Sequence, residues 1–145
     1  MKTVQDILKS KGSSHVHTVG PAATVLEAIS LMAQHGIGAL VVVAAGGRVI
    51  GIVSERDYAR KVVLMERSSY NTEVRDIMTA DVISVEPSAR TTHCMTLMTE
   101  KRLRHLPVVQ DGQLLGMVSI GDLVKDLISD QQAQIRQLES YIRGE

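Results

Sequence analysis

The sequence is poor in several residue types, and each shortage narrows the class of protein. Its 145 residues include one cysteine, three prolines and three tyrosines, with no tryptophan or phenylalanine. One cysteine makes no internal disulfide, so we expect a protein of a reducing compartment, the cytoplasm. Aromatics supply 2% of a chain that is 44% hydrophobic, so its core must consist of aliphatic and methionine side chains.

An excess of charge of either sign is also lacking. Sixteen basic and sixteen acidic residues cancel, which removes the electrostatic drive for binding nucleic acid. The first residues contain no apolar signal core, and the longest apolar run, 39–45, is too short to span a bilayer. We therefore expect partners that are neither nucleic acid nor membrane.

The chain contains an internal repeat. Residues 19–21 (VGP) recur as 85–87 (VEP), and residues 51–57 (GIVSERD) recur as 116–122 (GMVSIGD). A related pair of short segments, VQDI and VRDI, precedes the two halves. Matches in the same order indicate two homologous units of about sixty residues each.

Each unit is predicted to fold as strand, helix, hairpin, helix. In the first unit, residues 16–19 are a short strand that ends at a Gly-Pro turn. Thr24 and Glu27 have the spacing of a capping box, and Gly36 suits the end of the helix that follows. Apolar residues recur between them at helical spacing.

The rest of the first unit is predicted to be a hairpin and a helix. Residues 39–44 are a continuous apolar run, typical of a strand buried on both faces. Gly46-Gly47 reverses the chain into a second strand over 49–53. Residues 54–57 open the next helix, which is expected to carry Tyr58, Val62 and Met65.

The second unit repeats this pattern. Its hairpin pairs residues 106–109 with 114–118 through Asp111-Gly112, a strong turn signal. Pro107 donates no backbone hydrogen bond, so this strand is expected to be an edge or to be interrupted there. Between the units, residues 66–72 are polar and predict a surface linker.

A final helix is predicted from Asp122 to Tyr141 or beyond. Its isoleucines recur every seven residues, at positions 128, 135 and 142, as in a coiled coil. Either the first half packs on the core and the end is loosely ordered, or the distal half meets a second protomer.

Side chains able to do chemistry are few and scattered. His15 and His17 share one face of the first strand, but the spacings typical of zinc sites are absent, and two solvated histidines explain them better. Cys94 aligns with Ala28 on the apolar face of a helix, which indicates a buried structural thiol. The sequence also has no G-x-S-x-G, P-loop or G-x-G-x-x-G motif. We therefore expect no catalytic residue, no metal site and no enzyme activity.

The repeated G-h-h-S-x-x-D motif, where h is hydrophobic, is more informative. It places Ser54 and Asp57 in the first unit where Ser119 and Asp122 stand in the second. A serine N-cap followed by an acidic third residue stabilises a helix start without any ligand. The same helix start offers free N–H groups to an anion, and an aspartate there can accept hydrogen bonds from a ribose diol. Spacing alone leaves both interpretations open.

Duplicated units that each close with this motif resemble the tandem cystathionine-β-synthase (CBS) domain pair, the Bateman module. Residues 74–79 (VRDIMT) are similar to the family's entry segment, and residues 103–109 (LRHLPVV) to its second-strand motif. The resemblance covers nearly the whole chain and is to the stand-alone bacterial form.

The resemblance implies a mixed α/β (α+β) fold of two units related by a pseudo-twofold axis. Each unit would be a small sheet flanked by helices, and a C-terminal helix would follow. Residues 1–72 would form the first unit with its linker, 73–129 the second unit, and 130–145 a C-terminal helical extension.

In that family, adenosine-containing ligands bind in two clefts between the units, and modules pair as disc-like dimers. Carried onto this sequence, the resemblance places Asp57 and Asp122 on ribose hydroxyls, with Ser54 and Ser119 near ribose or phosphate. The walls of the clefts would include Thr18, Val19, Ile83 and Ser84. Adenine would lie against Gly38, Ala39 and Leu40 in one cleft and against Arg104, His105, Leu106 and Pro107 in the other. Val41 stands where the second unit has Pro107, so the first adenine pocket is expected to differ in shape.

Basic residues are shared unequally between the two motifs. Arg56, Arg60 and Lys61 follow the first motif, whereas Gly121 replaces the arginine in the second. These cations are either a solvated helix face or a clamp for several phosphates. The second possibility keeps NAD, ADP and ATP open beside AMP.

We interpret the chain as a non-enzymatic regulatory module that senses an adenine nucleotide, requires no cofactor and forms a homodimer. Ligand bridging both units would favour one packing of the units over another. The alternative is a structural dimerisation module with empty clefts, whose motifs only cap helices. A small redox or metal protein built on Cys94 and nearby histidines is a third hypothesis.

Overall fold

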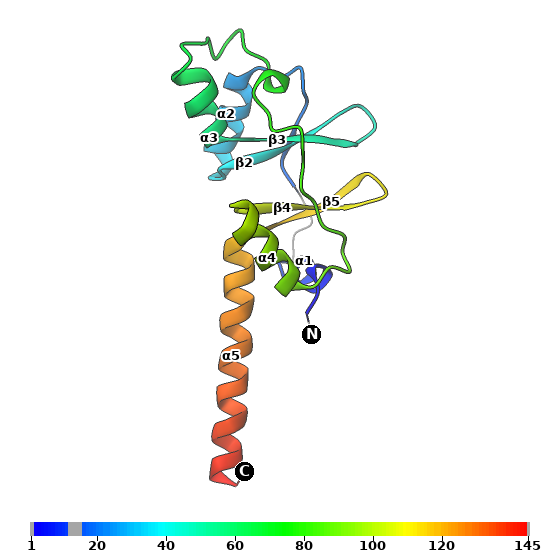
Figure 1. Cartoon of the computed structure of the whole chain (residues 1–145), viewed down its shortest axis with the longest axis vertical. Coiled ribbons are helices and arrows are strands. Elements are labelled where there is room, and N and C mark those ends of the chain that lie inside the picture. The colour runs from blue at the N-terminus through cyan, green and yellow to red at the C-terminus, as the bar shows by residue number, and fades with distance from the viewer. Residues whose placement is uncertain (1, 12–15, 145) are drawn as a thin grey trace.

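Two small sheets, each covered by helices, lie one above the other in the chain (Figure 1). The structure is a computed structural model that describes residues 2–11 and 16–144. The elements in chain order are the helix α1 (Val4–Ser10), β1 (Thr18–Val19), α2 (Val25–His35), β2 (Ala39–Val43), β3 (Val49–Ser54), α3 (Glu55–Tyr58), η1 (Ala59–Val63), η2 (Val74–Asp76), α4 (Thr91–Lys101), β4 (His105–Gln110), β5 (Gln113–Ser119) and α5 (Ile120–Arg143). The mixed α/β fold class is confirmed.

The first sheet has the order β1-β2-β3, with β1 parallel and β3 antiparallel to the central strand. The side chains of the middle of β2, Leu40 to Val42, are fully buried, as the continuous apolar run predicted. Thr24 caps α2 by accepting a hydrogen bond from the Glu27 amide, and Gly36 ends it with φ +63°. The predicted helix bounds are therefore confirmed.

The second sheet pairs β4 with β5 through the predicted Asp111-Gly112 turn, where both residues have positive φ. Strand β4 is not interrupted at Pro107, in contrast to one of the predicted outcomes. Instead, Pro107 lacks the backbone N–H that could pair with the segment around Val85, which runs parallel to β4. That segment is therefore held to β4 by a single bridge at Val85, where β1 pairs two residues with β2.

The helix after the first motif is shorter than predicted. The α-helix α3 has four residues and continues as a π-helical turn over η1, and Met65 lies beyond it with 61% of its surface exposed. Val62 and Val63 are β-branched and lower helix propensity here. The π turn nevertheless brings Val62 into the core.

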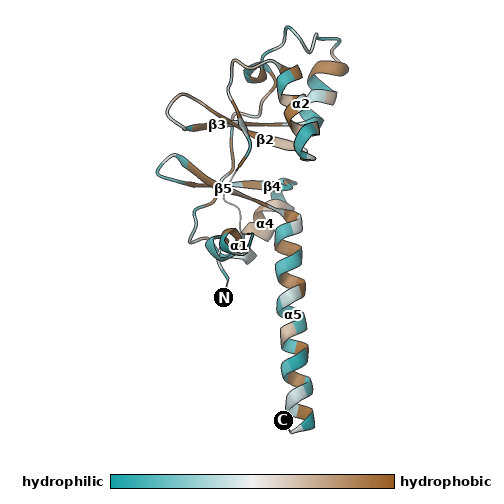
Figure 2. Ribbon diagram, turned by 180° about the vertical axis from the view of Figure 1, so that it is seen from behind, coloured by the Kyte–Doolittle hydropathy of each residue, from teal (hydrophilic) through white to brown (hydrophobic). Residues whose placement is uncertain are grey.

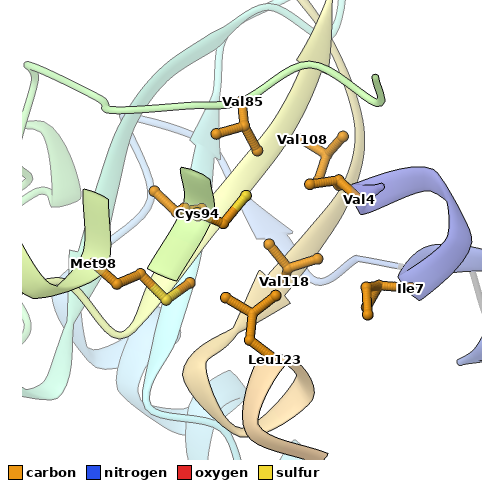
Figure 3. Packing of buried hydrophobic residues seen from close by; sticks show 9 residues of the cluster. Val4, Ile7, Val85, Cys94, Met98, Val108, Val118 and Leu123 are labelled. Carbon is orange, nitrogen blue, oxygen red and sulfur yellow. The ribbon is translucent and has the colours of Figure 1, made fainter. Parts of the chain in front are cut away.

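The hydrophobic core of each unit contains the entry segment of the other unit. Val4 and Ile7 of α1 pack into the core of the second unit, with Val108, Val118 and Leu123 (Figure 3). In the same way, Val74 and Ile77, from the entry segment of the second unit, pack into the core of the first. The two units are therefore interlocked by their entry segments.

Two equivalent glycines accommodate these crossed segments. A Cβ atom on Gly116 of β5 would lie 2.7 Å from Leu8 Cδ2 of α1. A Cβ atom on Gly51 of β3 would meet the sulfur of Met78, at the position equivalent to Leu8. A side chain at Gly116 or Gly51 would push the entry segment that packs on it, at Leu8 or Met78, away from the sheet of the other unit.

The last helix, α5, is a single element of 24 residues that starts at the second motif and projects away from both sheets (Figure 2). Its first turns are anchored by Leu123 in the core and by Lys2, which pairs with Asp126 and Asp130. Among the described residues, none of the helices is both long and apolar enough to cross a membrane.

Candidate functional site

The two repeated motifs have the same backbone geometry. Ser54 at the end of β3 pairs with Ala39 at the start of β2, and Ser119 at the end of β5 pairs with His105 at the start of β4. The first helical amide of each motif donates to the residue before the partner strand, to the Gly38 carbonyl in one unit and to the Arg104 carbonyl in the other. The residues proposed to hold adenine and ribose are thus neighbours within each unit.

Both aspartates form capping boxes. The Asp122 carboxylate accepts from the Ser119 amide at 2.9 Å, while the Asp122 amide donates to Ser119 Oγ at 3.1 Å. Ser54 and Asp57 make the same reciprocal bonds. Capping is therefore present in the structure, and it leaves part of each carboxylate's hydrogen-bonding capacity open to a ligand.

A cavity of about 330 Å³ lies between the two units at the second motif. The first unit contributes residues next to β1 and β2, and the second contributes both strands of its hairpin. Its lining residues are Leu8, Lys11, Val16, His17, Ile37, Ala39, His105, Gly116, Met117 and Ser119. The structure thus brings Ala39 and His105 to one cavity, whereas the family resemblance implied a separate cleft for each.

Lys11, at the end of α1, reaches the second motif. Its Nζ donates to Asp122 Oδ2 and to the Met117 carbonyl, each at 2.9 Å. Burial alone would raise the pKa of Asp122, but the hydrogen bonds from Ser119 and the Lys11 ammonium outweigh it and hold the pKa below 3.8. Asp122 is thus a carboxylate that already has a cation beside it.

Lys11 is a residue of the site that the sequence motifs do not predict. No pattern near the second motif points to a residue 111 positions earlier in the chain. The only available signal was the match of the two entry segments, because a segment that recurs before each unit can pack on the other unit.

Among the described residues, the histidines that line the cavity are His105 and His17. Burial lowers the pKa of His105 below 6.5, although the nearby Asp122 carboxylate opposes this shift. The ring of His17 stacks on His35 with centroids 3.7 Å apart. A neutral His105 therefore faces the cavity as a ring that can stack or accept a hydrogen bond.

The first motif is charged differently. Asp57 lies 3.4 Å from Lys61 Nζ, which also donates to the Ile77 carbonyl. Arg56 and Arg60 are exposed on the surface. Where the second motif has Lys11, the equivalent residue of the other entry segment is Asp81. The two motifs thus offer unlike charge to a ligand.

The remaining candidate residues divide between walls and cores. The side chains of Leu40 and Leu106 are fully buried in the two hydrophobic cores, so only their backbone atoms are available to a ligand. Pro107 is buried as well. Ile83 packs against the second core, and Thr18 pairs with Val41 in β1.

Cys94 is fully buried in the second core, and burial raises the pKa of its thiol, so the predicted structural role is confirmed. His15 lies outside the described residues. Among those described, no group of three or more His, Cys, Asp or Glu side chains could hold a metal ion.

Two equivalent units that line one cavity from both sides define a repeat-pair protein. The chain belongs to the CBS domain family, whose model matches residues 4–64 and 74–129. The resemblance stated from the motifs is therefore confirmed.

Known proteins are similar over most of the chain. The mitochondrial CBS domain-containing protein CBSX3 of Arabidopsis thaliana is 42% identical over 98% of this chain and 72% of its own length. A solved structure of a CBS-domain protein from Burkholderia ambifaria MC40-6 is 57% identical, with a TM-score of 0.83 over 90% of this chain and 96% of that one. The CBS domain pair of protein MJ0100, solved with 5′-methylthioadenosine and S-adenosyl-L-methionine, is 25% identical, with a TM-score of 0.78 over 90% of this chain and 98% of that one.

Proposed function

We propose that this CBS pair is a non-catalytic regulatory module that binds an adenosine-containing ligand in the cavity at Ser119. The observation that carries the proposal is that one cavity is lined by residues of both units, including a motif serine. The MJ0100 pair, which shares this fold, was solved with two adenosine derivatives and supports the ligand class.

The size and charge of the cavity favour a small nucleotide. A volume of about 330 Å³ is at the lower end of ligand pockets. It suits AMP better than the dinucleotide NAD or the polyphosphates ADP and ATP. Lys11 places a positive charge in the described part of its wall, which favours a ligand with an anionic group.

In this proposal each wall residue has one task, and so has Asp122, which bonds to Lys11 and Ser119 of the wall. Asp122 accepts hydrogen bonds from the ribose diol in place of Lys11, and the released ammonium pairs with the phosphate. The adenine lies between the backbone at Ala39 and the neutral ring of His105. Because the ligand then touches both units, its binding shifts the population of their relative packings. A homodimer of the chain transmits that shift.

The first motif is a second candidate site. Arg56 and Arg60 are free to turn toward a ligand that carries several phosphates, and Asp57 would accept from its ribose. We assign polyphosphates or NAD to this motif and AMP to the other. We place the protein in the cytoplasm, although the similar protein CBSX3 is mitochondrial.

A structural module with empty clefts is the competing function, and one observation favours it. Thr3 and Asp6 form a third capping box of the same geometry at the start of α1, outside the residues that line the cavity. The box by itself is thus no sign of a ligand.

This third box provides a matched control. Asp122→Ala removes a charged acceptor and should weaken AMP binding about ten- to a hundredfold, equivalent to about 1.5–3 kcal/mol. Asp6→Ala removes the acidic N3 residue of an exposed capping box, so it should lower the stability only slightly and leave AMP affinity unchanged. Calorimetry with AMP and thermal melting of both variants give the two quantities.

A ligand panel tests the class. AMP at a hundred times its dissociation constant should stabilise the fold by about 2.7 kcal/mol, and GMP should do less. If no adenosine compound at millimolar concentration moves the melting temperature, the ligand proposal is wrong and the structural module stands. If Asp122→Ala and Asp6→Ala have the same effect on AMP affinity, Asp122 is only a cap.

A further inference from the structure

Most of α5 lies beyond the body of the protein. Its 24 residues correspond to about 36 Å of helix, and in Figure 1 the distal half extends away from both sheets. Among its residues only Leu123 is buried, and Lys2 holds the same end through Asp126 and Asp130. The anchored face of the helix is therefore the one that carries Leu123 and Asp126.

A second face of α5 is apolar and exposed. At 100° per residue, the centre of this face lies about a quarter turn from Leu123, and its side chains spread from about 0° at Tyr141 to about 140° at Ile128. Their exposed fractions are lowest at Val124, 42%, and highest near the end of the helix, with 85% at Tyr141 and 81% at Ile142. This face, the α5 stripe, comprises Val124, Leu127, Ile128, Ile135, Leu138, Tyr141 and Ile142.

The stripe has the spacing of a coiled-coil seam. Ile128, Ile135 and Ile142 occupy the a positions of successive heptads, and Val124 and Leu138 occupy d positions. A seam of this kind buries its side chains against another helix of the same period. A second copy of α5 supplies such a helix.

We propose that the α5 stripe pairs with the stripe of a second copy in antiparallel orientation, with the two helices crossing at the level of Ala133. In this register Val124 faces Ile142 of the second copy. Ile128 likewise faces Leu138 of the second copy. Each of these layers brings two exposed apolar side chains together.

The flanking positions select the antiparallel orientation. In antiparallel coiled coils g positions neighbour g positions and e positions neighbour e positions, so Leu127 meets Tyr141 of the second copy. Lys125 then meets Glu139 of the second copy, an opposite-charge pair formed twice by symmetry. A parallel pair would place Leu127 beside a glutamine and would form neither contact.

Two further features bear on the orientation. Antiparallel helices align their macrodipoles favourably and place the two bodies at opposite ends of the pair. Gln131 faces Ile135 of the second copy in this register, whereas a parallel pair would place two Gln131 side chains together. The Gln131 layers are thus the weakest of the seam, and they limit the affinity of the dimer.

Engineered cysteines test the orientation. Chains carrying Val124→Cys, mixed with differently tagged chains carrying Ile142→Cys, should form a disulfide-linked heterodimer under mild oxidation. Ile142→Cys alone should not, since that residue faces its own copy only in a parallel pair. The wild-type chain controls for Cys94, which is fully buried. A link with Ile142→Cys alone, or no link in the mixture, overturns the proposal.

A charge swap tests the register without oxidation. Glu139→Lys should weaken dimerisation about 5- to 30-fold, measured by sedimentation, because it replaces two opposite-charge pairs with like-charge pairs. Adding Lys125→Glu should restore the wild-type affinity. Arg136→Glu, on the outer face of the helix, is the matched control and should change little. If the double variant stays as weak as Glu139→Lys, the register is wrong.

Discussion

Replacing Lys11 with methionine tests how the cleft distinguishes charged from neutral ligands. The Lys11 ammonium bonds to Asp122 Oδ2 and to the Met117 carbonyl, each at 2.9 Å. Methionine keeps most of the aliphatic stem and removes the charge. The ion pair is partly exposed, with 37% of the Lys11 side chain and 23% of the Asp122 side chain accessible, so its loss should cost the fold no more than about 1 kcal/mol.

The effect on binding depends on the charge of the ligand. Adenosine should bind up to about fivefold more tightly to Lys11→Met, because its ribose no longer competes with the ammonium for Asp122. AMP should gain the same release but lose a charge-assisted hydrogen bond worth about 1.5–3 kcal/mol. The ratio of AMP to adenosine affinity should therefore fall about ten- to a hundredfold.

Calorimetry with both ligands measures this ratio, and Lys9→Met is the control, because Lys9 is exposed on the same helix and does not line the cavity. An NMR titration supplies a readout that needs no ligand: the pKa of Asp122 should rise in Lys11→Met, since burial then acts with one opposing charge fewer. Equal changes for AMP and adenosine would refute the proposed role of Lys11.

Two further outcomes follow from the packing and from His105. Gly116→Ala should destabilise the fold by about 1–3 kcal/mol, because the new methyl group would lie 2.7 Å from Leu8. Adding Leu8→Ala should cost less than the sum of the two single changes. Chemical denaturation measures both effects, and Gly121→Ala, whose methyl group would make only an ordinary van der Waals contact, is the control. Because burial holds the pKa of His105 below 6.5, the unfolded chain binds a proton before the folded chain does as the pH falls. The contribution of the neutral His105 to the free energy of unfolding should therefore be present above pH 6.5 and be lost below it. His105→Gln should flatten that loss in denaturation curves measured across this pH range, and an unchanged slope would contradict the assignment.

Much of the fold could be predicted because its determinants are local. The capping residue Thr24, the terminator Gly36 and the Asp111-Gly112 turn act through backbone geometry that a few neighbouring residues fix. The continuous apolar run of β2 likewise predicts that the strand is buried. These elements need no knowledge of what packs on them.

The cleft could be predicted only in part. The motif residues Ser119 and Asp122 are visible as a repeat, but the cation beside them comes from α1. The early end of α3 was missed for a similar reason, since Val62 is drawn into the core by contacts that local periodicity does not contain. A contact between residues far apart in the chain, unlike a helix cap, produces no pattern in the residues next to it.

The crossed entry segments have a consequence for synthesis. The ribosome makes Val4 and Ile7 before the rest of their core, because the residues that bury them include Val118 and Leu123, which emerge more than a hundred residues later. Throughout that interval α1 is too short to hold its helix unaided, and its apolar face stays open to other chains or to chaperones. The core of the first unit can form sooner, because Val74 and Ile77, which complete it, follow that unit directly in the sequence. Folding during synthesis should therefore close the first core early, while the second core closes only when Val118 and Leu123 reach the earlier-made α1.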